Sequence, residues 1–99
     1  MKVALESLKK LSKLIMENKD ELYNIDTRGD ILNEIQNIGT NIVEVRIDSA
    51  RSNNEYESYK SIRNLLNSLI HDLIINNENP DIGLKMCSDI GLVLAALDH

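Results

Sequence analysis

The chain has 99 residues, 42% of them hydrophobic and 27% charged, and a formal net charge of −5 at pH 7. The length predicts one domain spanning residues 1–99, the apolar content excludes intrinsic disorder, and no apolar run approaches the roughly 20 residues that span a bilayer, so we expect a cytoplasmic protein. The negative charge argues against binding to a nucleic-acid backbone, which needs a dense basic surface, and favours a basic protein as the partner.

The first helix is predicted over residues 2–23, because apolar side chains recur there at helical spacing. They form one stripe: Ala4, Leu8, Leu11, Ile15 and Leu22. Five lysines oppose two glutamates in residues 1–19, which gives this segment a net charge of +3 and leaves −8 for residues 20–99. We expect the basic face of this helix to dock onto the acidic remainder of the chain.

The second helix is predicted to begin at Thr27, which precedes Asp30 by the spacing of a capping box. Apolar side chains then follow at intervals of 4, 3, 4 and 3, the period of a helix packed on another helix. They are Ile31, Ile35, Ile38, Ile42 and Val45. Residues 41–47 also alternate β-branched and charged side chains as a strand would, but no partner strand is evident, so a helix is favoured. Gly39 is expected to mark a bend or a close helix crossing.

Two further helices complete the predicted fold. Asn54 and Glu57 form a second capping signature, from which the third helix starts. Its expected core stripe is Tyr59, Ile62, Leu66, Leu69 and Leu73. Asn79 and Pro80 supply an N-cap and a first helical position for the fourth helix, which ends near Leu97. Four helices with short connections predict an all-α antiparallel bundle with up-down-up-down topology.

Small residues recur at every fourth position of the fourth helix. They are Gly83, Cys87, Gly91 and Ala95. Such a row lets another backbone approach closely, and close packing would offset the roughly 1 kcal/mol that an interior glycine costs relative to alanine. Packing within the molecule is the simpler expectation, and a homodimer seam is the alternative.

Acidic side chains cluster around the connection between the first two helices. They are Asp20, Glu21, Asp26, Asp30 and Glu34, with Tyr23 among them. An aromatic residue ringed by charge is a frequent anchor of protein interfaces, and an acidic rim steers a basic partner during encounter. These residues, together with Tyr56 of the third helix, are the candidate partner-binding set. An ordinary solvated turn is the alternative interpretation.

No residue set carries a specific catalytic chemistry, so we expect neither an enzyme nor a cofactor or metal site. Two histidines and one cysteine are too few for the usual metal sites. His71 followed by Asp72 resembles the phosphoacceptor box in the dimerisation helices of some sensor histidine kinases. The resemblance covers these two residues, with Ile70 in place of the arginine or glutamate of that family, and it implies phosphotransfer through His71.

These features favour a small acidic module that binds and inhibits a basic protein. An immunity protein that neutralises a nuclease toxin, or a phage-encoded antagonist, combines this size and charge with the absence of catalytic groups. The abundance of Ile, Asn and Lys is typical of an AT-rich coding sequence, which points to a bacterial or phage source. A homodimeric structural or assembly protein is the alternative, and a phosphotransfer module built on His71 is a third.

Overall fold

The computed structural model describes residues 1–97 as a series of helices. The elements are α1 (Lys2–Glu17), α2 (Ile25–Ile38), the π-helical segment η1 (Gly39–Val43), α3 (Glu44–Asp48), α4 (Asn53–Ile75) and α5 (Ile82–Leu97). Because α2, η1 and α3 continue without a break, the described chain forms four helical rods and contains no strand. The expected all-α bundle is confirmed, and residues 41–47 are helical.

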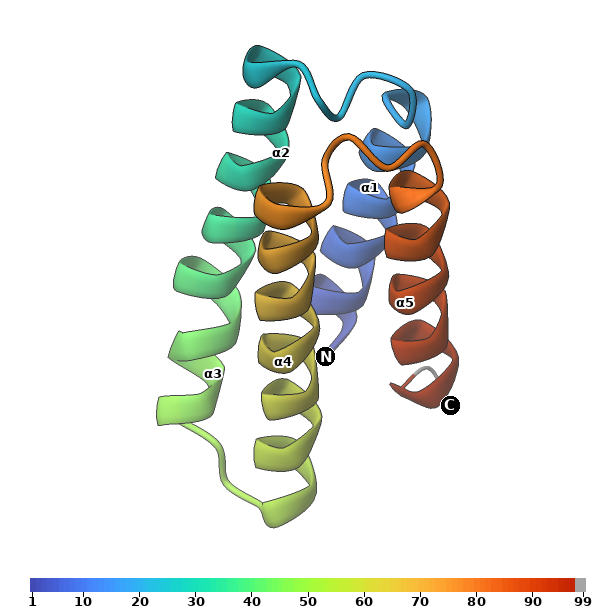
Figure 1. The fold of residues 1–99 in the computed structure, drawn as a ribbon. Helices are drawn as coiled ribbons and strands as arrows, with labels where there is room; N and C mark the ends of the chain where they lie inside the picture. Colours follow the sequence, from blue (N-terminus) through green and yellow to red (C-terminus); the bar gives the residue numbers. More distant parts are fainter. Residues whose placement is uncertain (98–99) are drawn as a thin grey trace.

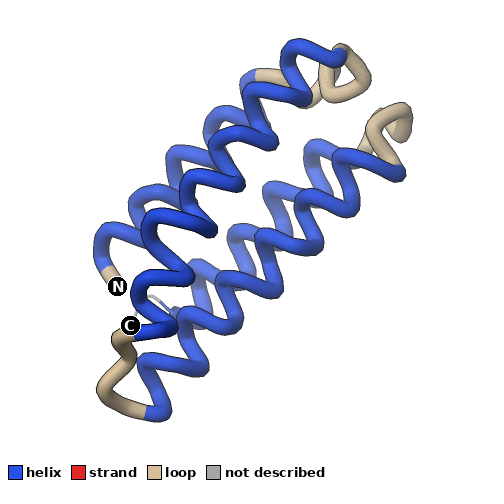
Figure 2. The backbone as a smooth tube through the Cα atoms, turned by 90° about the vertical axis from the view of Figure 1, so that its left-hand side faces the viewer, coloured by secondary structure: helices blue, strands red, loops and turns tan. Residues whose placement is uncertain are grey.

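The rods alternate in direction along the chain (Figure 1). α1 packs against α2 and α5, and α4 packs against α5 and against the rod formed by α2, η1 and α3. Figure 2 shows the α1–α2 and α4–α5 connections together at one end, and the α3–α4 connection at the other end, toward which α1 starts and α5 ends. The up-down-up-down topology therefore brings two connections that are distant in sequence to one end of the bundle.

Aliphatic side chains fill the space between the rods. Residues without solvent exposure include Leu8, Ile15, Ile62, Leu69 and Ile90. Every member of the predicted stripe of α4 is buried, so the helical spacing identified this part of the core correctly. Each such side chain contributes about 1.5–3 kcal/mol through burial. Within residues 1–97, every helix is too short or too polar to span a bilayer.

α1 ends at Glu17, earlier than predicted, because Asn18 terminates it. The Asn18 Nδ2 atom donates a hydrogen bond to the carbonyl oxygen of Leu14 at 2.8 Å. The backbone N–H of Asn18 donates to the carbonyl oxygen of Ile15 at 3.1 Å. Leu22 nevertheless reaches the core from the connection and is 1% exposed. The apolar pattern therefore identified the buried side chain correctly, whereas the helix boundary was wrong.

The predicted N-caps of the second and third helices were also wrong. The Asn24 side-chain oxygen caps α2 by accepting hydrogen bonds from the backbone N–H groups of Asp26 at 2.9 Å and Thr27 at 3.2 Å. Ser52 caps α4, because its Oγ accepts from the backbone N–H of Glu55 at 3.1 Å. Each polar break offers several side chains that can cap a helix, and the local pattern does not rank them.

α5 begins at Ile82 and not at Pro80. The Asn79 side-chain oxygen accepts a hydrogen bond from the backbone N–H of Asp81 at 3.0 Å. The backbone N–H of Lys85 donates to the carbonyl oxygen of Asp81 at 3.1 Å, which is the first helical bond. Asn79 and Pro80 therefore form a turn that precedes the helix.

η1 shifts the buried stripe of its rod by one residue. The backbone N–H of Glu44 donates to the carbonyl oxygen of Gly39, five residues earlier, so this turn holds an extra residue. Ile38 and Val43 are buried, whereas Val45, which the sequence placed in the core, is 55% exposed. Gly39 thus begins a π-helical turn, and the extra residue rotates Val45 away from the core.

Candidate functional site

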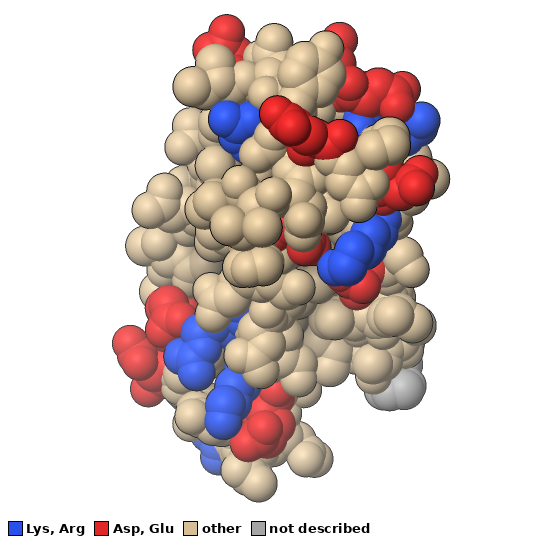
Figure 3. All heavy atoms as spheres, viewed as in Figure 1, with Lys and Arg blue, Asp and Glu red and all other residues tan. Residues whose placement is uncertain are grey.

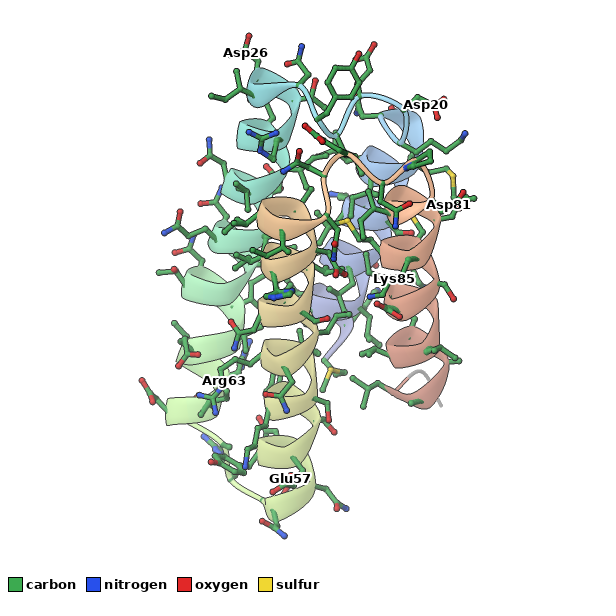
Figure 4. All side chains as sticks on the ribbon, viewed as in Figure 1. Asp20, Asp26, Glu57, Arg63, Asp81 and Lys85 are labelled. Carbon is green, nitrogen blue, oxygen red and sulfur yellow. The ribbon has the colours of Figure 1, made fainter. Side chains whose placement is uncertain are left out.

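Carboxylates gather at the end of the bundle that carries the α1–α2 and α4–α5 connections (Figure 3). We call residues 18–30 and 74–82 the acidic end. Its cationic side chains are Lys19 and Arg28, and its six carboxylates are all exposed. These carboxylates belong to Asp20, Glu21, Asp26, Asp30, Glu78 and Asp81. Figure 4 shows Asp20 and Asp26 pointing outward at opposite sides of this end.

The structure brings together five of the seven residues predicted for partner binding. They are Asp20, Glu21, Tyr23, Asp26 and Asp30. Glu34 is exposed farther along α2, and Tyr56 lies in the first turn of α4 at the opposite end, where its ring centroid is 5.8 Å from the Nζ atom of Lys60. Glu78 and Asp81 were missed, because their place beside the first connection follows from the topology and not from the local sequence.

Large apolar side chains are exposed among these carboxylates. They are Tyr23, Ile25, Ile74 and Ile75, each at least 57% exposed. Ten large hydrophobic residues of the described chain are exposed, and four of them lie at the acidic end. An apolar centre with a charged rim is the usual organisation of a protein interface.

Arg28 holds the α1–α2 connection in place. Its Nη1 atom donates hydrogen bonds to the carbonyl oxygens of Tyr23 at 2.8 Å and Leu22 at 3.4 Å. The Nζ atom of Lys19 lies 3.5 Å from an Oδ atom of Asp20. Both cations of the acidic end are thus engaged within the chain. The Tyr23 side chain projects from a fixed backbone, which reduces the entropy lost on binding.

A pocket of about 200 Å³ lies between the two connections. Leu22, Tyr23 and Pro80 supply apolar wall, whereas Asp20 and Glu78 supply carboxylates. The pocket is smaller than the roughly 300–1,000 Å³ sites of drug-sized ligands, so it suits a single protruding side chain.

The row of small residues on α5 is divided between the interior and the surface. A Cβ atom at Gly83 would lie 2.7 Å from the Cβ of Lys19, so the two backbones approach closely there. Cys87 Sγ donates a hydrogen bond to a backbone carbonyl of α1 at 3.4 Å. Gly91 and Ala95 are exposed, and no atom lies within 4 Å of a Cβ built at Gly91. The row therefore packs within the molecule over its first half only.

Asp72 is a buried carboxylate that the sequence analysis did not single out as structural. It is 4% exposed and accepts a hydrogen bond from Lys85 Nζ at 2.9 Å, while Lys85 also donates to Asp89 at 2.9 Å. These hydrogen bonds, that of Asp72 above all, raise the pKa of Lys85 above its ordinary value of 10.5. Figure 4 places Lys85 on the side of α5 that faces α4. Asp72 lies three residues after the buried Leu69, and this helical spacing could have predicted that Asp72 faces the core. His71, by contrast, is exposed.

Comparisons with protein-family models, curated proteins and solved structures found no match for this chain. Across the part of the chain that the structure describes, no three His, Cys, Asp or Glu side chains are grouped so that they could hold a metal ion.

Proposed function

We propose that this protein binds a basic protein through the acidic end and inhibits it. The observation that carries the proposal is the exposure of four large apolar side chains among six carboxylates at one end of the bundle. Apolar anchors of this kind supply most of the binding energy in an interface, and the surrounding carboxylates select a cationic partner and accelerate its encounter.

The partner that fits this chemistry is an enzyme with a cationic groove for nucleic acid. The acidic end would cover the groove with Tyr23 as an anchor and exclude the phosphate backbone from it. An immunity protein that neutralises a nuclease toxin acts in this way, and so would a phage-encoded antagonist of a host enzyme. The net charge of −5 supports the pairing, because it favours encounter with a cationic surface.

Charge reversal at the acidic end tests this proposal. The triple variant Asp26→Lys, Asp30→Lys and Glu78→Lys should slow the association of a fluorescently labelled peptide rich in arginine and lysine by about tenfold or more at low salt. The difference should shrink as salt screens the charges. Stopped-flow fluorescence at several ionic strengths measures both effects.

A matched control changes the net charge by the same amount elsewhere. Glu6→Lys, Asp48→Lys and Glu57→Lys alter exposed carboxylates outside the acidic end. This control should retain faster association than the first variant. Equal slowing by both triple variants would show that net charge alone governs encounter and would overturn the proposal.

A homodimeric structural or assembly protein is the second candidate, and the outer face of α5 favours it. The exposed apolar residues of this face are Leu84, Gly91, Leu92, Ala95 and Ala96. The charged side chains of α5 are Lys85 and Asp89, which bond to each other. On an acidic chain, a face of this kind lets two copies meet with little charge repulsion, and its apolar residues can form a self-complementary contact.

A further inference from the structure

A second pocket, of about 230 Å³, lies at the start of α1, away from the acidic end. Four elements contribute to its wall: the start of α1, η1, α3 and α4. Its polar lining comes from Lys2, Asn41, Arg46 and Tyr59. The volume is again below that of sites for drug-sized ligands, so the pocket suits a small group.

The charges of this pocket are positive. Lys2 and Arg46 line it, and no carboxylate does. Neither side chain forms an ion pair with another residue of the described chain. Two cations without carboxylate partners create a local positive potential in a chain whose net charge is −5, and this potential favours an anion.

The start of α1 adds backbone donors to the same pocket. Met1 is the N-cap of this 16-residue helix and makes no side-chain capping bond, and the first turn contains no acidic residue. The backbone N–H groups of Lys2 and Val3, which both line the pocket, have no acceptor within the helix, because they belong to its first turn. Free N–H groups and the positive end of the helix dipole together form a site that suits an oxyanion.

Tyr59 provides an independent indication of a ligand. The residue is 3% exposed, and its hydroxyl makes no hydrogen bond to the described residues, although it is not sealed from solvent. The ring is buried while the hydroxyl, which has no partner among the described residues, stays open to solvent, so it remains available to a ligand of the cationic pocket that Tyr59 lines. Asn41 reaches the same pocket from η1, and π-helical turns occur frequently at functional sites.

We infer that this pocket binds a phosphate group, either as the free ion or as the ester of a small molecule. Lys2 and Arg46 neutralise its charge, the first N–H groups of α1 donate to its oxygens, and the Tyr59 hydroxyl donates a further hydrogen bond. A phosphate is favoured over a carboxylate because its oxygens are more numerous and can accept from all of these donors at once. The site is independent of the acidic end and of the function proposed for it.

Titration of the full chain with sodium phosphate tests the inference, with any affinity tag at the C-terminus and the ionic strength held constant with sodium chloride. Amide NMR signals of the first turn of α1 and of η1 should shift and saturate. Arg46→Gln should weaken binding by about tenfold, because it removes a charge-assisted hydrogen bond. Tyr59→Phe should also weaken binding several-fold, and since it keeps the buried ring, circular dichroism should confirm an unchanged fold.

Lys10→Gln is the matched control, because it removes one exposed positive charge of α1 away from the pocket. It should leave phosphate affinity nearly unchanged. Methyl phosphate serves as the second probe: tighter binding than inorganic phosphate assigns the site to an ester, and weaker binding assigns it to the free ion. Shifts that do not saturate, an equal loss of affinity in Lys10→Gln and Arg46→Gln, or equally tight binding of acetate would each overturn the inference.

Discussion

Asp72 places a carboxylate inside the bundle, on the face of α4 that packs against α5. A buried charge is costly unless it is paired and hydrogen-bonded. Lys85 meets this requirement from the neighbouring helix, while 53% of its own side chain stays exposed to solvent. The pair therefore ties α4 to α5 at one defined position, which an entirely aliphatic contact would specify less sharply.

Removing the cation should reveal this dependence. Lys85→Met keeps an apolar stem of similar shape but leaves the Asp72 carboxylate buried without its partner. We expect the free energy of unfolding to fall by about 1–3 kcal/mol, measured by urea denaturation with circular dichroism. Asp89→Asn, which disturbs only the more exposed ion pair of Lys85, should cost about 0.5 kcal/mol or less. Equal losses in the two variants would contradict the assigned role of Asp72.

Single residues also show where sequence reasoning reaches its limit. The polar breaks between helices were predicted, yet Asn24 caps α2 in place of Thr27, because both side chains can cap and the surrounding packing selects one of them. Tyr59 was predicted as a core residue and is one, but its unpartnered hydroxyl becomes evident only when η1 and the start of α1 are placed around it.

At the scale of elements, the two glycines of α5 have opposite surroundings and should respond oppositely to alanine. Gly83→Ala puts a Cβ 2.7 Å from Lys19 Cβ and 3.1 Å from its Cα, so the backbones must separate, at a cost of about 1–3 kcal/mol. Gly91→Ala meets no atom within 4 Å and should stabilise the helix by up to about 1 kcal/mol. Thermal unfolding followed by circular dichroism measures both, and a stabilising Gly83→Ala would contradict the close approach.

Helical periodicity predicted the long, regular elements and failed where the helix changes type. The stripe of α4 was correct throughout, because regular α-helical spacing encodes one face. The stripe of the second rod was correct as far as Ile38 and then wrong at Val45. A π-helical turn inserts one residue into the repeat. Because aliphatic residues occur on both sides of this rod, the sequence alone does not decide which of them face the core, and the neighbouring helices must be placed first.

For the whole molecule, topology assembles surfaces that no local segment contains. The sequence predicted the part of the acidic end that the α1–α2 connection supplies, because those carboxylates are clustered in sequence. Glu78 and Asp81 join them because α4 and α5 return the chain to the same end. The cationic pocket could not be predicted, because Lys2, Arg46 and Tyr59 come from separate elements and have no common sequence signature.

The oligomeric state decides whether the outer face of α5 has a function of its own. If the chain is a homodimer joined there, light scattering at high concentration should give twice the chain mass of 11.2 kDa, and Gly91→Leu should return it to the monomer. The charge-reversed variant of the acidic end serves as the control and should remain dimeric. A wild-type protein that stays monomeric at high concentration would rule out this second function.

The start of α1 and the end of α5 lie toward the end of the bundle farthest from the acidic end (Figure 2). A fluorescent protein, a surface anchor or a second module attached at either terminus would therefore project away from the face proposed for the partner. A tandem repeat of the bundle joined by a linker could present two such faces at once, and bivalent capture of a target with two binding sites would then depend on the length and stiffness of the linker.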